Sequence, residues 1–183
     1  MRLTKLIILK FILLLVVSCY SINKVTTIDN ETGYYPARKS REATITRSIK
    51  VDPDTLRNLV VVNNSEYIRG MAINMKYFKE VMDFSDLEKD LIAEGYEVKG
   101  RLNLGSLDHY IEYINNNPLT VLYMDRRKDG NKMYAELKLY EPVNGEDIFV
   151  SEIFLNMIYD GWTDKGTTYP LFNSLIDYLK GLE

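Results

Sequence analysis

Three strand-like segments joined by two glycine turns form the pattern that most constrains the fold. Residues 119–124 have apolar side chains on both faces of the expected strand, which is typical of a central strand covered on both sides. Apolar and polar residues alternate over 133–140, and a third segment rich in strand formers covers 148–155. Asp129-Gly130 and Asn144-Gly145 favour hairpin turns, because the central positions of a type I′ turn need positive φ. The pattern predicts a three-stranded antiparallel meander.

A closing helix is predicted directly after the meander, at about 170–180. Pro170 suits the first turn of a helix, and Gly181 suits its end. Five apolar residues form a helical stripe: Leu171, Phe172, Leu175, Ile176 and Leu179. We expect this stripe to pack on the meander face that carries Leu137 and Leu139.

The patterns before the meander are weaker. They predict strands at 45–51, 59–62 and 96–98 and a helix at 106–114. Residues 66–82 fit a helical face and a strand face almost equally, and we favour the helix. Ser85-Asp86-Leu87-Glu88 is a capping-box pattern that starts a helix, which Gly95 should end. The fold class is therefore α+β: a mixed sheet with the C-terminal meander, helices packed on one face and a closing helix.

The first 19 residues have the pattern of an export signal. A short positive start precedes an apolar run over Leu6–Val17 that only Lys10 interrupts, and Cys19 is the sole cysteine. A bilayer-spanning helix needs about 20 apolar residues, so a run of this length predicts a signal peptide over 1–18 rather than a membrane span. A signal cut elsewhere, with Cys19 incidental, is the alternative.

Val16-Val17-Ser18-Cys19 resembles the lipobox of bacterial lipoproteins. This resemblance implies cleavage before Cys19 and acyl chains on its sulfur and amino group, which would attach the chain to a membrane. In lipoproteins of Gram-negative bacteria an aspartate after the cysteine favours the inner membrane. Tyr20 at that position favours the outer membrane, facing the periplasm. In a cell with one membrane, the anchor would be the outer leaflet of that membrane.

The chain is expected to have one domain behind a linker. Residues 19–42 predict a lipidated cysteine followed by a flexible tether, because they are polar, contain Gly33 and Pro36 and show no sustained period. Fully extended, such a tether would reach ~75–80 Å. Residues 43–183 then form a single α+β domain.

Charge and composition argue against a nucleic-acid partner and indicate how the domain is stabilised. The signal holds three of the 23 Lys and Arg residues and none of the 26 Asp and Glu residues, so the remaining chain has a net charge of −6. This acidic balance argues against a nucleic-acid partner. After acylation no cysteine would remain for a disulfide, so core packing must stabilise the domain.

We predict no catalytic residue, cofactor or metal, and therefore no enzyme. His109 is the only histidine, and Ser106 and Asp108 stand beside it. Residues at these spacings on a helix do not all face one site. Asp125 and Asp129 flank a turn, but three cations lie between them, whereas a calcium loop needs a dense set of oxygen ligands.

The connection between the third meander strand and the closing helix is a candidate for partner binding. At 156–169 it is long for a compact domain, and it carries Tyr159 and the only tryptophan, Trp162. Tyr and Trp are frequent hot spots of protein interfaces. The alternative, which is slightly favoured, is that Met157, Ile158 and Trp162 cover the end of the sheet as part of the core.

The layout of the mature chain resembles a group of envelope lipoprotein domains. The segments that carry the likeness are LVVVNN, LTVLYMDRRKDGNKMYAELKLYEPVNGEDIFVSE and YPLFNSLIDYLK. The group includes the amino-terminal domain of the Tol-system periplasmic protein, the curli-secretion lipoprotein and lipoprotein activators of peptidoglycan synthases. The resemblance implies no site residue. We expect a membrane-anchored lipoprotein that binds another envelope protein without catalysis. The alternatives are a binder of a small ligand or lipid and an envelope hydrolase.

Overall fold

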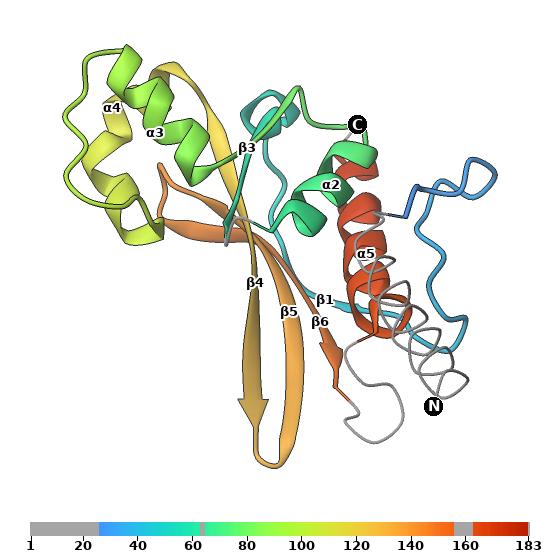
Figure 1. The fold of residues 1–183 in the computed structure, drawn as a ribbon. Coiled ribbons are helices and arrows are strands. Elements are labelled where there is room, and N and C mark those ends of the chain that lie inside the picture. Colours follow the sequence, from blue (N-terminus) through green and yellow to red (C-terminus); the bar gives the residue numbers. More distant parts are fainter. Residues whose placement is uncertain (1–25, 63–64, 156–162, 183) are drawn as a thin grey trace, which may run out of the picture.

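The computed structural model describes residues 26–62, 65–155 and 163–182, and a mixed sheet lies at the centre of this part of the chain (Figure 1). The strands are β1 (Thr44–Ser48), β2 (Asn58–Val61), β3 (Glu80–Asp83), β4 (Leu119–Asp129), β5 (Lys132–Glu141) and β6 (Glu146–Phe154). The α-helices are α2 (Glu66–Asn74), α3 (Phe84–Ala93), α4 (Ile111–Asn116) and α5 (Tyr169–Lys180), with shorter helices η2 (Pro53–Leu56), η4 (Leu104–Tyr110) and η5 (Asp164–Thr168). The predicted α+β class and the closing helix are confirmed.

The predicted meander is formed by β4, β5 and β6, which pair antiparallel in sequence order. Its first turn differs from the predicted type. Asp129 pairs with Lys132, so the two central residues are Gly130 and Asn131 rather than Asp129 and Gly130. Gly130 has φ 55, and Asn131 does not have positive φ. One positive φ at the first central position is the requirement of a type II′ turn, which glycine meets without a steric cost.

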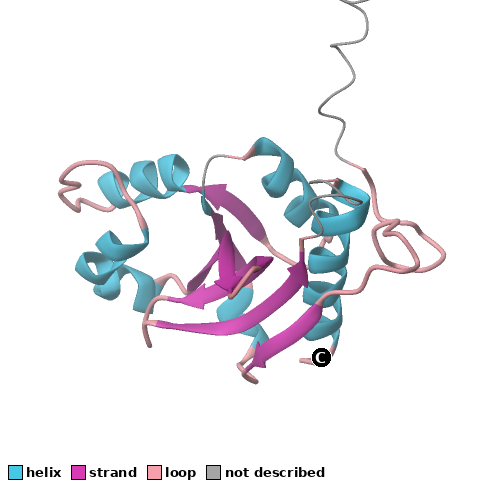
Figure 2. Cartoon of the chain, turned by 90° about the horizontal axis from the view of Figure 1, so that it is seen from below, coloured by secondary structure: helices cyan, strands magenta, loops and turns pink. Residues whose placement is uncertain are grey.

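The remaining strands make the sheet mixed and place helices on both of its faces. Its order is β1-β6-β5-β4-β2-β3, with β2 parallel to both β3 and β4. Parallel neighbours need crossover connections, which are almost always right-handed. The chain moves outward from β2 to β3 through α2 and returns past β2 to β4 through α3, η4 and α4. Two right-handed crossovers in opposite directions place their helices on opposite faces (Figure 2).

The two faces have separate apolar cores. Leu59 and Val61 of β2 belong to the core shared with α2 and α5, whereas Val60 belongs to the core shared with α3, η4 and α4. This division follows from the alternation of side chains along a strand. The prediction that the helices pack on one face is therefore wrong. The sequence pattern of a helix shows which of its own faces is buried, but not on which side of the sheet its crossover lies.

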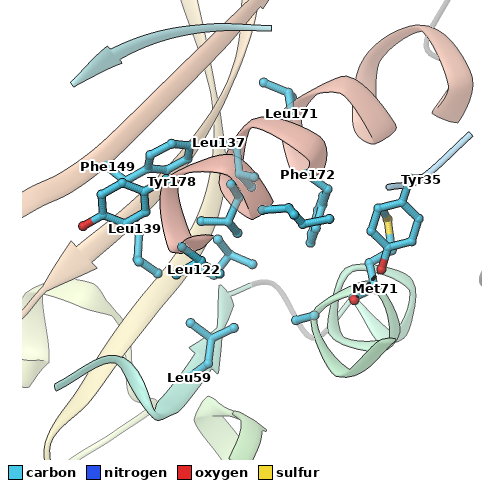
Figure 3. Close-up of a cluster of buried hydrophobic side chains, with 14 of the residues drawn as sticks. Tyr35, Leu59, Met71, Leu122, Leu137, Leu139, Phe149, Leu171, Phe172 and Tyr178 are labelled. Carbon is cyan, nitrogen blue, oxygen red and sulfur yellow. Dashed lines mark hydrogen bonds between the residues drawn. The ribbon is translucent and has the colours of Figure 1, made fainter. Parts of the chain in front are cut away.

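The closing helix packs as expected. Phe172 and Leu175 are fully buried in the same core as Leu137 and Leu139 of β5. Figure 3 shows Phe172 facing Leu137 and Leu122 between α5 and the sheet. The Pro170 position in the first turn of α5 is also confirmed.

Two regions before the meander differ from their prediction. Residues 66–82 form a helix and then a strand, so each of the two patterns applies to part of the segment: α2 ends at Asn74 and β3 begins at Glu80. Helix α3 is capped by Asp83, whose carboxylate accepts hydrogen bonds from the amides of Ser85 and Asp86, rather than by Ser85. The earlier start makes Phe84 part of the helix and of its buried face.

Further along, residues 96–98 form no strand, and the helix predicted at 106–114 is divided into η4 and α4. Gly95, with φ 87, follows the end of α3 as predicted.

Residues 26–42 pack on the domain instead of forming a flexible tether, and we call them the N-terminal strap. Tyr35 is 2% exposed, and its hydroxyl donates to the carbonyl of Met71 at 2.6 Å. Asn173 of α5 forms two hydrogen bonds with the backbone of Tyr35, at 2.8 and 2.9 Å. Further on, Arg41 donates to the carbonyls of Phe154 and Gly166. The strap runs beside α5 in Figure 1, where it is blue.

Candidate functional site

The two residues predicted to bind a partner, Tyr159 and Trp162, and the predicted lipidation residue, Cys19, lie outside the described residues. These three assignments stay predictions.

The only histidine takes no part in a triad-like arrangement with its neighbours. The Ser106 hydroxyl donates to the Asn103 carbonyl at 2.8 Å and accepts from the Asn103 amide at 2.9 Å, so it caps η4. Asp108 and His109 are exposed. Within the described ranges, no three His, Cys, Asp or Glu side chains are grouped as a metal site.

The described structure has a cleft of about 790 Å³ beside the strap. It lies between the strap, η2, the end of α2 and the end of α5, and we call it the strap cleft. Its lining residues are Thr27, Ile28, Asn30, Gly33, Pro53, Arg57, Asn74, Met75, Lys76, Tyr77, Ile176, Leu179 and Lys180. Its volume lies within the range of roughly 300–1,000 Å³ that is usual for small-molecule sites.

The apolar part of the strap cleft is continuous with the core beneath α5. Ile176 and Leu179 are 6% and 2% exposed and come from the last two turns of α5. Met75 and Tyr77, after α2, and Ile28 of the strap are partly buried against the same core. Ile28, Met75 and Tyr77 therefore provide the accessible apolar surface of the cleft, and core packing holds that surface in place.

Cationic residues accompany this apolar surface. Arg57, Lys76 and Lys180 line the strap cleft, and none of the described lining residues carries a carboxylate. Arg57 is paired with Asp54 at 2.7 Å, in an exposed ion pair, so its charge is partly compensated. Lys76 and Lys180 therefore contribute most of the positive charge.

The strap holds Lys180 at the edge of the cleft. The Lys180 Nζ atom lies 4.2 Å from the centroid of the Tyr34 ring, a cation–π contact. The Tyr34 hydroxyl in turn donates to the Asp177 carboxylate at 2.5 Å. Gly33 has φ 72, a backbone conformation that would strain any residue with a side chain, although a Cβ there would meet Lys180 Nζ at an ordinary contact distance of 3.5 Å.

Lys76 occupies an unusual backbone position. Its φ is 55, and among the described residues no other non-glycine residue has a positive φ. It directly follows Met75, the C-cap of α2, at the position where glycine commonly ends a helix. A side chain in this left-handed conformation costs about 1–2 kcal/mol, so the position keeps a lysine at a cost in stability. Strained residues of this kind are concentrated at functional sites.

A second candidate site is a polar surface of the sheet. It lies on the same face of the sheet as α3 and α4, on the part of the strands that these helices do not cover. We call it the charged sheet face, and it comprises Tyr123, Asp125, Arg127, Tyr134, Glu136, Lys138, Asp147 and Glu152 on β4, β5 and β6. Alternation places it on the same side as Val121 and Tyr140, which pack against α3 and α4. Figure 1 shows that the β4–β5 ribbon extends well beyond these helices.

Ion pairs link the side chains of the charged sheet face. Arg127 donates twice to Glu152, at 2.7 and 3.0 Å, and its Nε atom lies 3.3 Å from Glu136. Lys138 contacts Glu136 at 2.9 Å and Asp125 at 3.2 Å. Glu136 is only 5% exposed although no helix lies above it in the described part of the chain, because its neighbours cover it.

The pKa shifts on this face follow from the same contacts. The Arg126 amide and the Lys138 ammonium lower the pKa of Asp125. Burial alone would lower the pKa of Lys138, but its hydrogen bonds to Glu136 and Asp125 outweigh burial and raise that pKa. Burial raises the pKa of Tyr123, and its hydrogen bond to Asp147 raises it further. Asp125 and Lys138 are therefore both charged, and paired with each other, at neutral pH.

No protein-family model matches the chain, and neither a curated protein nor a solved structure matches it.

Sequence reasoning did not identify the strap cleft. Its lining residues come from four segments that lie between residues 27 and 180, and no local pattern connects them. Part of the charged sheet face is visible in the sequence as the polar residues that alternate with Ala135, Leu137 and Leu139, but their pairing across β4 and β6 is not.

Proposed function

We propose that this chain is a lipid-anchored, non-catalytic binding protein of the bacterial cell envelope, and that the strap cleft is its ligand site. The observation that carries the proposal is the composition of the cleft: an apolar surface beside cationic residues, with no carboxylate among the described lining residues. The lipobox-like sequence at 16–19 supports the anchor, and Tyr20 supports the outer membrane as its place.

The ligand that fits best has an apolar part and an anionic group. The partly exposed side chains of Ile28, Met75 and Tyr77 would exclude water from the apolar part, at roughly 25 cal/mol per Å² of apolar surface buried. Lys76 and Lys180 would attract the anionic group. The cleft is open, so a ligand can enter without a large rearrangement of α5 or the sheet.

A titration of the full mature chain with dodecyl phosphate, compared with the uncharged dodecyl maltoside, tests the ligand class. Amide NMR signals of Gly33 and Lys76 should shift with dodecyl phosphate, and those of Gly95 and Gly100, which do not line the cleft, should not. Equal shifts with both detergents, or shifts spread over the whole chain, would contradict an anion-selective cleft.

The anchor is tested separately. The native protein should have an intact mass that includes acyl chains on an N-terminal Cys19, and Cys19→Ala should release the chain from membranes. In a Gram-negative host the protein should fractionate with the outer membrane, and Tyr20→Asp should move it to the inner membrane. An unmodified mature chain that begins at another residue would show that the lipoprotein assignment is wrong.

A second candidate function is binding of another envelope protein through the charged sheet face. The specific observation is that Arg127, Glu136 and Glu152 are already fixed by mutual contacts on an extended ribbon, so binding would cost little side-chain entropy. Crosslinkers placed at Tyr134 in whole cells should capture one defined partner. Crosslinks to many abundant envelope proteins alike would count against a specific interface.

A further inference from the structure

The packing of the strap limits how far the domain can stand from its anchor. The first described residue, Thr26, follows Cys19 by seven residues, and the next residue, Thr27, lines the strap cleft. A chain spans at most ~3.3–3.6 Å per residue, so the cleft wall at Thr27 lies within roughly 30 Å of an acylated Cys19. This is less than half of the ~75–80 Å that a fully flexible tether over 20–42 would allow.

The charge of the domain restricts which side can face an anionic membrane. The chain after the predicted signal has a net charge of −6, so most orientations would be repelled by such a surface. The strap cleft combines a short connection to the anchor with cationic residues, Lys76 and Lys180, that are exposed. Of the acids near the cleft, Asp29 accepts from the amides of Glu31 and Thr32, Asp177 accepts from the Tyr34 hydroxyl, and Asp54 pairs with Arg57.

We infer that the strap cleft faces the bilayer in which the protein is anchored and holds an anionic phospholipid of that bilayer. This inference rests on the lipid anchor proposed above. Lys76 and Lys180 contact the headgroup phosphate, and the apolar surface of Ile28, Met75 and Tyr77 covers the start of one acyl chain. The domain therefore lies against the membrane surface, oriented by its ligand, and its β4–β5 ribbon is available to other molecules.

Vesicle binding by a chain without its acyl anchor tests the inference. The full mature chain with Cys19→Ser should bind phosphatidylcholine vesicles that contain phosphatidylglycerol more tightly than vesicles of phosphatidylcholine alone. Each cation near an anionic surface contributes ~1 kcal/mol, which is roughly a fivefold effect, so the double variant Lys76→Gln/Lys180→Gln should bind about 30-fold more weakly. Equal binding to both kinds of vesicle would overturn the inference.

A matched control separates the cleft from general electrostatics. The double variant Lys89→Gln/Lys99→Gln removes the same charge from lysine side chains that are 70% and 80% exposed and do not line the cleft. It should lose at most a few-fold in affinity, because charges farther than a Debye length of about 8–10 Å from the membrane are screened. Equal losses for both double variants would show that the cleft has no special role and would refute the proposal.

A measurement on the native lipidated protein identifies the occupant of the cleft. After reconstitution into the phosphatidylglycerol vesicles, acetylation of Lys76 and Lys180 should fall several-fold relative to Lys89 and Lys99. Protection that is the same in detergent without vesicles would mean that a segment of the chain or its own acyl group fills the cleft, and the inference would be wrong. A failed anchor would instead appear as an unacylated intact mass, while vesicle binding by the Cys19→Ser chain would be unaffected.

Discussion

Replacing Lys76 with glycine should stabilise the domain. The φ of 55 at this residue costs a side chain about 1–2 kcal/mol, and glycine adopts it without that cost. Glycine also increases the entropy of the unfolded chain, which is worth ~0.4–1 kcal/mol in the opposite direction. Lys76 is exposed, so little packing is lost. The expected net gain is about 0.5–1 kcal/mol.

Thermal unfolding followed by circular dichroism measures this gain. For a domain of this size, 1 kcal/mol corresponds to a shift in Tm of about 2–4 °C, so Lys76→Gly should raise Tm by ~1–4 °C. Lys76→Ala is the matched control, because it removes the same charge and keeps the backbone strain, and its Tm should change little. A Tm for Lys76→Gly at or below that of Lys76→Ala would refute the strain argument.

The same substitution should weaken binding. Loss of one cation from the strap cleft predicts a roughly fivefold lower affinity for vesicles that contain phosphatidylglycerol. Higher stability combined with weaker binding is expected for a position at which function is kept at a cost in stability. Unchanged binding would mean that the strained lysine has no part in ligand recognition.

Three other substitutions test the core and the titrating groups. Leu175→Ala should lower the free energy of unfolding by ~2–5 kcal/mol in urea denaturation, because Leu175 is fully buried, and an unmoved curve would place α5 elsewhere. A hydrogen bond from Lys89 lowers the pKa of Asp86, so the ionised Asp86 carboxylate stabilises the fold above about pH 4, and this stabilisation is lost as the pH falls further. Asp86→Asn should lower the free energy of unfolding by ~0.5–1 kcal/mol at neutral pH. The variant should also lose less stability than the wild type as the pH falls below about 4. Burial raises the pKa of Tyr178 to about 12, so the neutral phenol stabilises the fold below about pH 10, and this stabilisation is lost as the pH rises toward 12. Tyr178→Phe, which removes the bond to the Ile49 carbonyl, should cost ~1 kcal/mol at neutral pH and reduce the alkaline loss.

Local patterns predicted the parts of the fold that local interactions determine. The alternation over 133–140 and the glycines at 130 and 145 were sufficient for the order and pairing of the meander strands, because side-chain period and turn positions are set within a few residues, although the first turn is not of the predicted type. The same holds for α5, whose stripe and Pro170 both lie inside the helix. Residues 66–82 contain both patterns, and the parallel pairing of β3 with β2, which the local sequence does not show, accounts for the strand at their end.

The strap and its cleft could not be predicted in this way. Residues 26–42 are polar and without period, which is also the composition of a linker. Their order comes from contacts such as the bonds between Tyr35 and Asn173, which are 138 residues apart in the chain. A partner at that distance leaves no mark in the local sequence. The side of the sheet on which α3 and α4 lie was missed for a related reason, because it depends on the order of strands and not on the helices themselves.

The strap also sets an order of events during synthesis. Tyr35 cannot reach its partners on α5 until residues 169–173 have been made, and the Arg38 amide must likewise wait for the Lys165 carbonyl. Because a chain emerges from its N-terminus, residues 26–42 stay accessible until the domain is almost complete. An enzyme that acted at the predicted processing residue, Cys19, before the chain was complete would therefore meet residues 26–42 not yet docked on α5. Resistance of residues 26–42 to a protease consequently reports that the final helix is in place.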